Sequence, residues 1–369
     1  MSEKHLDKLE EVRSLRIPEG RRLFSAEHAE ILAGETTDVY FIRTLEILRS
    51  LGLDQTPVTA EIFPRASGVL CGVEEAVSFL QDLPIEVEAL PEGARFEPKE
   101  VVMRIRGPYA AFATAETIIL GLLASSSGWA TAAAECRAAA GSRPMICFGS
   151  RHLHPAVAPV MERAAVIGGC DGASNILAAK LLGKEPSGTV PHAVFLIVGD
   201  TVKVAEAYHR LMPPDAPRII LIDTFKDEAE EALRVAEALG PALHGIRLDT
   251  PGERGGVTPD LVREVRYRLD QAGHTHVKIF ISGGLTPERI ELLAAAGADA
   301  FGVGSYISGA SPIDMTMDLK VVNGRPVAKR GRLPGELPNP RLVRRLPRQT
   351  RARAAPWAER GPKRPGTRR

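Results

Sequence analysis

Two glycine-containing clusters follow the two apolar runs of the stretch KIFISGGLTPERIELLAAAGADAFGVGS (278–305). The runs KIFIS and AFGVGS predict buried strands, and the segment between them predicts a helix with Pro287 in its first turn. Glycines at the ends of parallel strands let backbone N–H groups approach an anion, most often a phosphate. One cluster would be explained by a tight turn alone. Two at equivalent strand ends predict a phosphate-binding site formed by Gly283, Gly284, Gly302, Gly304 and Ser305.

Ionisable and aromatic side chains follow other apolar runs that are typical of strands. A single aspartate at such a point could cap the next helix, and a single histidine is more often structural. Several such groups at successive strand ends instead predict a site for a phosphorylated substrate. The carboxylates there would bind hydroxyls or a divalent cation, or stabilise a developing positive charge. The residues concerned are Phe148, Arg151, His152, His154, His192, Asp223, Arg247 and Asp249.

A sheet of parallel strands would bring these side chains together. From about residue 111, the runs PMICFG, SGTVPHA, RIILIDT, HGIRLDT, VKIFISGG and AFGVGS alternate with helical patterns. Six such runs in series predict an α/β sheet that closes, or nearly closes, into a barrel. The nearly uncharged stretch ATAETIILGLLASSSGWATAAAECRAAAG predicts a buried pair of helices.

The chain divides into four parts by pattern and composition. Residues 1–110 mix helical and strand patterns and predict an N-terminal α+β domain, and residues 111–310 predict the catalytic α/β barrel domain. Residues 311–340 are expected to return to the N-terminal domain. Residues 341–369 hold eleven Lys/Arg and one acidic residue, a net charge of +10, whereas the rest of the chain carries −9 (36 basic against 45 acidic). We expect this Arg/Pro-rich tail to be disordered and solvated rather than bound to nucleic acid.

Composition indicates an ordinary soluble enzyme, with 44% hydrophobic and 25% charged residues. No apolar run reaches the length of a membrane span, so no membrane partner is expected. The four cysteines are scattered and include no CxxC pair. They predict free thiols in the cytoplasm and no zinc site.

The motifs GSRHLHP, GGCDGASNILAAK, GTVPHA, IRLDTPG and ISGGL…GVGS, in this order, resemble those of nicotinate phosphoribosyltransferases. These enzymes belong to the type II phosphoribosyltransferase family, together with nicotinamide and quinolinate phosphoribosyltransferases. The resemblance runs from TTDVYF at residue 36 to KRGRLPG, which ends at residue 335. It implies an irregular or incomplete α/β barrel beside an N-terminal α+β domain.

The resemblance also implies a role for each matching residue. Tyr40 and Phe148 match the aromatics that sandwich the pyridine ring, with Tyr40 supplied by the neighbouring subunit of a head-to-tail homodimer. Arg151 and Arg247 match arginines that bind ligand phosphate or carboxylate. Asp249 matches a carboxylate on the ribose hydroxyls, Asp223 matches one beside ribose and diphosphate, and the five residues of the glycine clusters match the 5′-phosphate site. His192 matches the histidine that ATP phosphorylates in ATP-coupled members.

The implied reaction joins nicotinate to 5-phosphoribosyl 1-diphosphate and yields nicotinate mononucleotide and diphosphate, a step of NAD salvage. Mg²⁺ would accompany the phosphorylated substrates, and ATP would be a co-substrate that stimulates turnover. The pyridine nitrogen is already nucleophilic, so the reaction needs no strong general base.

The choice of pyridine depends on Ser174, which is expected near the start of a helix. Nicotinamide-specific relatives carry an aspartate at the matching position, which would repel a carboxylate, whereas a serine there suits one. A shift of three positions would put Asp171 there and reverse the inference, and both residues could simply cap the helix. Nicotinamide or quinolinate transfer, another phosphate-binding barrel enzyme, and a nucleic-acid-binding protein stay as alternatives.

Overall fold

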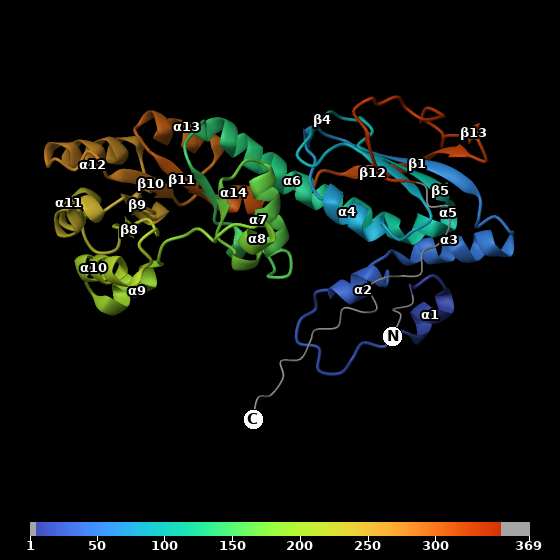
Figure 1. Cartoon of the computed structure of the whole chain (residues 1–369), viewed down its shortest axis with the longest axis horizontal. Coiled ribbons are helices and arrows are strands. Elements are labelled where there is room, and N and C mark those ends of the chain that lie inside the picture. Colours follow the sequence, from blue (N-terminus) through green and yellow to red (C-terminus); the bar gives the residue numbers. More distant parts are fainter. Residues whose placement is uncertain (1–4, 348–369) are drawn as a thin grey trace. The chain divides into compact units, whose positions relative to one another are not determined.

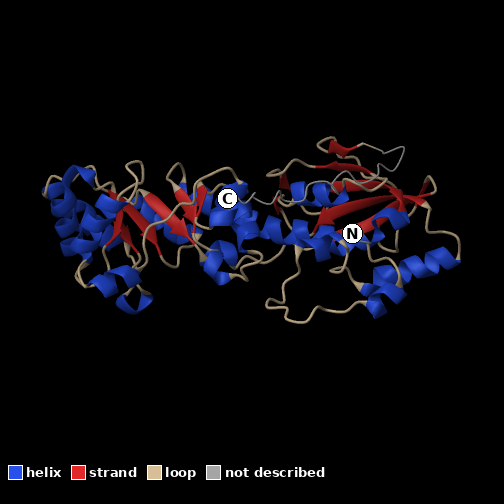
Figure 2. Cartoon of the chain, turned by 60° about the horizontal axis from the view of Figure 1, so that its bottom comes forward, coloured by secondary structure: helices blue, strands red, loops and turns tan. Residues whose placement is uncertain are grey.

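The computed structural model describes residues 5–347, which fold as two compact units (Figures 1 and 2). Of the described residues, the first unit comprises 5–127 and 312–347, and the second comprises Gly128–Ser311. The division falls within helix α6 (Glu116–Ala140), so the first part of this helix belongs to the first unit.

The first unit is built on an antiparallel sheet with the strand order β13-β12-β1-β5-β3-β14. Helix α4 and the first turns of α6 place apolar side chains such as Ala76, Leu80, Ile119 and Leu123 in its core. Strands β2 and β4 form a separate two-stranded sheet in the same unit. The strands are β1 (Pro57–Pro64), β2 (Gly68–Val69), β3 (Glu86–Ala89), β4 (Arg95–Phe96), β5 (Met103–Pro108), β12 (Met315–Val322), β13 (Arg325–Pro326) and β14 (Val343–Leu346), and the helices that precede α6 are α1 (Leu9–Ser14), α2 (His28–Leu32), α3 (Val39–Ser50), α4 (Val73–Leu80), α5 (Tyr109–Phe112) and the 3₁₀ turn Ala113–Ala115.

The second unit is built on a six-stranded sheet in which every pairing is parallel, with the order β7-β6-β11-β10-β9-β8. Helices α10 to α13 surround these strands in Figure 1, as expected when each crossover helix covers a buried parallel sheet. The strands are β6 (Met145–Cys147), β7 (Gly172–Ala173), β8 (Ile219–Leu221), β9 (Gly245–Leu248), β10 (Lys278–Ser282) and β11 (Ala300–Val303), and the helices are α7 (Ala158–Ile167), α8 (Ile176–Leu181), α9 (His192–Val198), α10 (Thr201–Leu211), α11 (Glu228–Leu239), α12 (Pro259–Gln271), α13 (Pro287–Ala295) and α14 (Ser305–Ser308), with short 3₁₀ turns at Ser150–His152, Gly240–Ala242 and Gly252–Arg254.

This architecture confirms the α/β class and the incomplete barrel, because β7 and β8 are edge strands that do not pair with each other. One predicted strand, SGTVPHA, is wrong. Residues 184–191 are irregular, and His192 begins helix α9. Pro186 and Pro191 explain the difference, since proline has no N–H for a strand ladder and Pro191 suits the position before a helix. The short strand β7 was not predicted.

Three further expectations need correction. The predicted helix pair is the single helix α6. Residues 343–346 of the predicted disordered tail form strand β14, which pairs with β3; residues 348–369 lie outside the described residues. By length and composition alone, the helical stretch Tyr109–Ala140 would be long enough to cross a membrane, although half of its most apolar part is buried within the protein, as in a core helix.

Candidate active site

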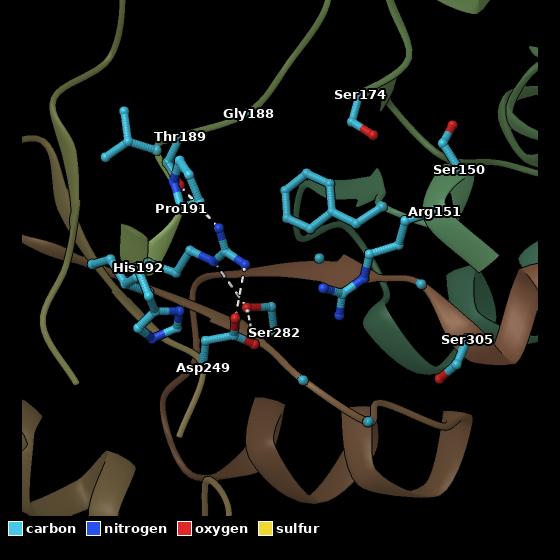
Figure 3. Close-up of a pocket in the computed structure, with 18 of the residues that line it drawn as sticks. Ser150, Arg151, Ser174, Gly188, Thr189, Pro191, His192, Asp249, Ser282 and Ser305 are labelled. Atoms are coloured by element: carbon cyan, nitrogen blue, oxygen red, sulfur yellow. Dashed lines mark hydrogen bonds and ion pairs between the residues drawn. The ribbon is translucent and has the colours of Figure 1, made fainter. Parts of the chain in front are cut away.

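A pocket of about 450 Å³ lies in the second unit, where the parallel strands end. Its lining comes from the last residues of β8, β9, β10 and β11, from the residues that follow β6, β7, β9, β10 and β11, and from the irregular segment that precedes α9 (Figure 3). The side chains that converge on it are polar or charged around one aromatic ring. The lining residues are Phe148, Ser150, Arg151, His152, Ser174, Gly188, Thr189, Val190, Pro191, His192, Leu221, Arg247, Asp249, Ser282, Gly283, Gly284, Gly302, Gly304 and Ser305.

Twelve of the fifteen residues predicted for the site line this pocket; the three exceptions are Asp223, Tyr40 and His154. Asp223 lies behind the pocket wall, where its side chain is fully buried. Tyr40 lies on helix α3 of the first unit and is 54% exposed.

A hydrogen-bonded chain links His192, Asp223 and Asp249. His192 Nε2 lies 3.0 Å from Asp223 Oδ1, and Asp223 Oδ2 accepts the backbone N–H of Asp249 at 2.8 Å. Burial raises the pKa of Asp223, and the neighbouring imidazole opposes that rise. The contact at Nε2 fixes the ring and leaves Nδ1 as the nitrogen available for other chemistry.

Arg247 is held at the centre of the pocket by three polar partners. Its guanidinium donates to Ser282 Oγ (2.9 Å), Thr189 Oγ1 (2.9 Å) and Asp249 Oδ2 (3.1 Å). The guanidinium carbon also lies 5.1 Å from the centre of the Phe148 ring, within the range of a cation–π contact. Burial lowers the pKa of Arg247, and Asp249 opposes this effect. The side chain is therefore preorganised before any ligand binds.

Three glycines of the two clusters leave room for side chains of the site, and Gly284 has a backbone conformation that favours glycine. A Cβ at Gly302 would lie 2.4 Å from the Phe148 ring, a Cβ at Gly304 would lie 3.1 Å from His152, and a Cβ at Gly283 would lie 2.8 Å from Asp249 Oδ1. These three glycines make room for side chains of the site. At Gly284 a Cβ would meet open space, but the φ of +58° favours glycine.

Backbone donors at these strand ends are free to bind an anion. Among the described residues, the N–H groups of Gly283, Gly284 and Gly304 donate to no backbone carbonyl. Ser305 lies next to them at the pocket wall. Unpaired backbone N–H groups beside a hydroxyl suit a phosphate group.

The two pocket serines at the other end bind a buried carboxylate. In Figure 3, Ser150 and Ser174 lie at the end of the pocket opposite Asp249 and His192. Both hydroxyls donate to Glu162 Oε1, at 2.7 Å and 2.9 Å. The Ser174 hydrogen is thus already used, which weakens the expectation that it would bind a ligand carboxylate.

Ser174 lies near the start of helix α8, as expected, but it does not cap the helix. Asn175 is the residue that caps it, accepting from the N–H of Ala178. Asp171, the other candidate for this position, does not line the pocket. It pairs with Arg137 and accepts the N–H of Met145 at 2.8 Å, so its role is structural.

Arg151 differs from Arg247 in having no partner. Among the described residues it forms no hydrogen bond or ion pair, and its side chain is exposed at the pocket. A guanidinium in this state is ready to bind a carboxylate or phosphate of a ligand.

The two histidines of GSRHLHP occupy different environments. His152 lines the pocket and its Nδ1 lies 2.9 Å from Ser308 Oγ. His154 does not line the pocket, and its Nδ1 accepts the N–H of Ala156.

Sequence reasoning missed several residues that organise the site: Ser150, Glu162, Thr189 and Ser282. Thr189 lies in the motif GTVPHA, from which His192 was predicted, and Ser282 lies in ISGGL, from which Gly283 and Gly284 were predicted. The signal for Glu162 was an acidic residue in the helical run APVMERAAV, in which Arg163 is the only other charged residue.

Within residues 5–347, no three His, Cys, Asp or Glu side chains gather closely enough to hold a metal ion. The four cysteines are buried, and they form no disulfide within residues 5–347. The carboxylate of Asp249 at the pocket is the kind of hard oxygen ligand that Mg²⁺ prefers.

Comparisons with known proteins agree with this architecture. Family models described as the N-terminal and C-terminal domains of quinolinate phosphoribosyl transferase match residues 38–127 and 129–318. A nicotinate phosphoribosyltransferase of Mycobacterium tuberculosis is 30% identical over 355 residues, which cover 85% of this chain and 78% of that protein. A nicotinate phosphoribosyltransferase of Bacillus subtilis is 30% identical over 311 residues, covering 73% of this chain and 62% of that one.

Solved structures give the same result. The chain is 45% identical to a nicotinate-nucleotide pyrophosphorylase from Pyrococcus furiosus, with a TM-score of 0.83 over 86% of this chain and 82% of that one. Human nicotinic acid phosphoribosyltransferase shares the fold, with a TM-score of 0.64 at 20% identity over 81% of this chain and 77% of that one. The order of the motifs, the open parallel sheet with its pocket, and these matches together establish that the chain belongs to the type II phosphoribosyltransferase family.

Proposed function

We propose that this protein transfers the phosphoribosyl group of 5-phosphoribosyl 1-diphosphate to nicotinate, forming nicotinate mononucleotide and diphosphate. The observation that carries this choice of substrate is the state of the two pocket arginines. Arg247 is already paired with Asp249, whereas Arg151 has no partner among the described residues. One partner-free guanidinium matches a pyridine with one carboxylate.

The reaction would use the two ends of the pocket for different groups. The 5′-phosphate would bind the free N–H groups at Gly284 and Gly304 and the Ser305 hydroxyl, while the pyridine ring would stack on Phe148. The bond between the anomeric carbon and diphosphate would break as the pyridine nitrogen attacks, and the electron pair would leave with diphosphate. Asp249 would stabilise the positive charge that develops on the ribose.

Asp249 and the diphosphate group would together hold Mg²⁺, which would neutralise the negative charge of the leaving diphosphate. The chain's own residues hold the reacting groups together, which accounts for much of the rate enhancement expected. We place this reaction in NAD salvage in the cytoplasm, where thiols stay reduced, because the four buried cysteines form no disulfide within residues 5–347.

We also propose that ATP stimulates turnover by phosphorylating His192. Its Nε2 lies against Asp223, so Nδ1 would take the phosphoryl group as the bond between the β- and γ-phosphates of ATP breaks. His192→Ala should retain slow synthesis without ATP and lose stimulation by ATP, and mass spectrometry of the parent protein after incubation with ATP and Mg²⁺ should find an acid-labile phosphate on His192. Unchanged stimulation in the variant, with no phosphohistidine in the parent, would leave His192 as a pocket residue only.

Transfer to quinolinate is the second candidate, because both matching family models are named for quinolinate phosphoribosyl transferase. Initial rates with nicotinate, quinolinate and nicotinamide, each with 5-phosphoribosyl 1-diphosphate and Mg²⁺, distinguish the candidates. We expect nicotinate to have the highest kcat/KM by at least about tenfold, the effect of one charge-assisted contact. A higher kcat/KM for quinolinate would replace the first proposal by the second.

A further inference from the structure

Glu162 is a buried carboxylate that the proposed reaction does not use. It lies on helix α7 with no exposed surface. Four donors surround it: the backbone N–H and hydroxyl of Ser150, the hydroxyl of Ser174 and the backbone N–H of Asn175, at 2.7 to 3.3 Å. All four donors are neutral groups.

The charge of Glu162 is therefore stabilised but not cancelled. No Lys, Arg or His within residues 5–347 forms an ion pair with it. A buried ion without a counter-charge acts over a longer range than an exposed one, because little water screens it. Ser150 and Ser174 lie between Glu162 and the pocket, so the negative charge of Glu162 acts at the pocket wall.

The direction of the two serine hydroxyls adds to this effect. Each hydroxyl has one hydrogen, and both hydrogens are directed to Glu162 Oε1. Ser150 and Ser174 line the pocket and so present oxygen lone pairs rather than hydrogens to a ligand. This wall accepts hydrogen bonds and repels negative charge.

We propose that Glu162 is a positioning residue that makes this wall selective against a second carboxylate on the pyridine ring. The inference rests on the proposed function and extends it: Arg151 would bind the single carboxylate of nicotinate, and the wall formed by Ser150, Ser174 and Glu162 would reject the second carboxylate of quinolinate. Like charges placed together in a binding site cost enough free energy to exclude a wrong ligand.

Three proteins test the inference: the parent, Glu162→Gln and Glu231→Gln. Glu231 is the control, because it is equally buried in the second unit but its side chain bonds to Arg234, which does not line the pocket, rather than to pocket serines. The dissociation constants of nicotinate and quinolinate are measured by calorimetry, without turnover. Removing the charge should lower the ratio of the quinolinate constant to the nicotinate constant by about tenfold or more.

If Glu162 were merely structural, Glu162→Gln would behave like Glu231→Gln, with a lower melting temperature and an unchanged ratio, and this result would overturn the inference. Equal affinity of the parent for the two pyridines would overturn it as well. If Glu162→Gln does not fold, Glu162→Asp replaces it. The shorter side chain draws the charge back from the two serines and frees their hydrogens for a ligand, so the ratio should fall; an unchanged ratio or a rise would contradict the inference.

The proposed function fails in a different way. It fails if the parent makes no nicotinate mononucleotide from nicotinate, whatever the two dissociation constants are. If the parent synthesises the nucleotide but Glu162→Gln has the same ratio as the parent, the proposed function stands and the proposed role of Glu162 is wrong.

Discussion

Single residues of the pocket are fixed by partners before a ligand arrives. Asp249 accepts from Arg247 through Oδ2 and from Ser282 through Oδ1. Asp223 connects His192 to the backbone of Asp249. Groups that are already oriented need no reorganisation in the transition state, and this preorganisation is an important source of electrostatic catalysis.

Asp249→Asn tests the role of that carboxylate. Loss of its charge should lower kcat by about 10²- to 10³-fold, the usual cost of removing one group that stabilises transition-state charge. The melting temperature should change little, because the amide keeps an oxygen that accepts from Ser282. Exposed Asp260, changed to Asn, serves as the control. Parent-like kcat in Asp249→Asn would remove Asp249 from the chemistry.

Glu116, at the start of α6, gives a pH-dependent prediction for stability. Burial, together with the nearby Asp318, raises its pKa to about 7 from an ordinary value of 4.5. The folded state therefore holds a proton that the unfolded state releases, so this residue's contribution falls as pH rises from 4.5 to about 7 and stays low above that. Glu116→Gln, which mimics the protonated acid, should be more stable than the parent by roughly 2–3 kcal/mol at pH 8 and nearly equal to it at pH 4.5.

Urea unfolding at the two pH values measures this difference. Exposed Glu97, changed to Gln, is the control and should show no such pH dependence. A gain in stability for Glu116→Gln that is the same at both pH values would show that its charge is not the cause.

Sequence reasoning located most residues of the site because they follow strands at one edge of the sheet. Arg247 lies within β9 and Asp249 directly follows it, and the glycine clusters lie at the ends of β10 and β11. The bonds of Ser150 and Ser174 to Glu162 could not be predicted in this way. They join side chains on separate elements, and no local pattern records such a contact.

Elements with strong local signals were predicted well. The unit β10-α13-β11 has buried strands, a helix capped by Thr286 with Pro287 in its first turn, and glycines at the strand ends. Strand β14 had no comparable signal, since its sequence is Val-Arg-Arg-Leu in a basic segment. Its stability depends on pairing with β3, more than 250 residues earlier in the chain.

The pairing of β14 with β3 gives a prediction at the element scale. Val343 pairs with Ala89 in the ladder, and Arg341 and Arg344 form ion pairs with Glu100 and Glu86. A chain that ends at residue 340 should be less stable than one that ends at residue 347 by about 1–3 kcal/mol, from lost backbone hydrogen bonds and weak ion pairs. Chemical unfolding of the two chains measures the difference. Equal stability would mean that β14 adds nothing to the first unit.

At the scale of the whole molecule, both units expose apolar side chains on helices. Tyr40, Ile47 and Leu51 are exposed along or next to α3 of the first unit, and Ile176 and Ile197 are exposed on α8 and α9 of the second. Exposed apolar surface of this kind is typical of a subunit interface. We propose that the protein is a homodimer in which Tyr40 completes the pyridine site of the partner.

Light scattering after gel filtration measures the first part of this proposal, and kinetics of Tyr40→Ala measures the second. The variant should raise KM for nicotinate by about tenfold, the cost of roughly 1.4 kcal/mol of lost aromatic stacking, and raise KM for 5-phosphoribosyl 1-diphosphate less. Equal effects on the two KM values would indicate that Tyr40 is a packing residue. A monomeric parent protein would contradict the shared site.

A crystal structure of the protein with nicotinate mononucleotide tests the central claim most directly. The account predicts one nucleotide in the pocket of the second unit, with its 5′-phosphate against Gly284, Gly304 and Ser305. The pyridine ring should lie on Phe148, and its carboxylate should bind Arg151 rather than Ser174. A nucleotide bound outside this pocket, or bound with its phosphate at Arg151 and its ring at the glycines, would contradict the account.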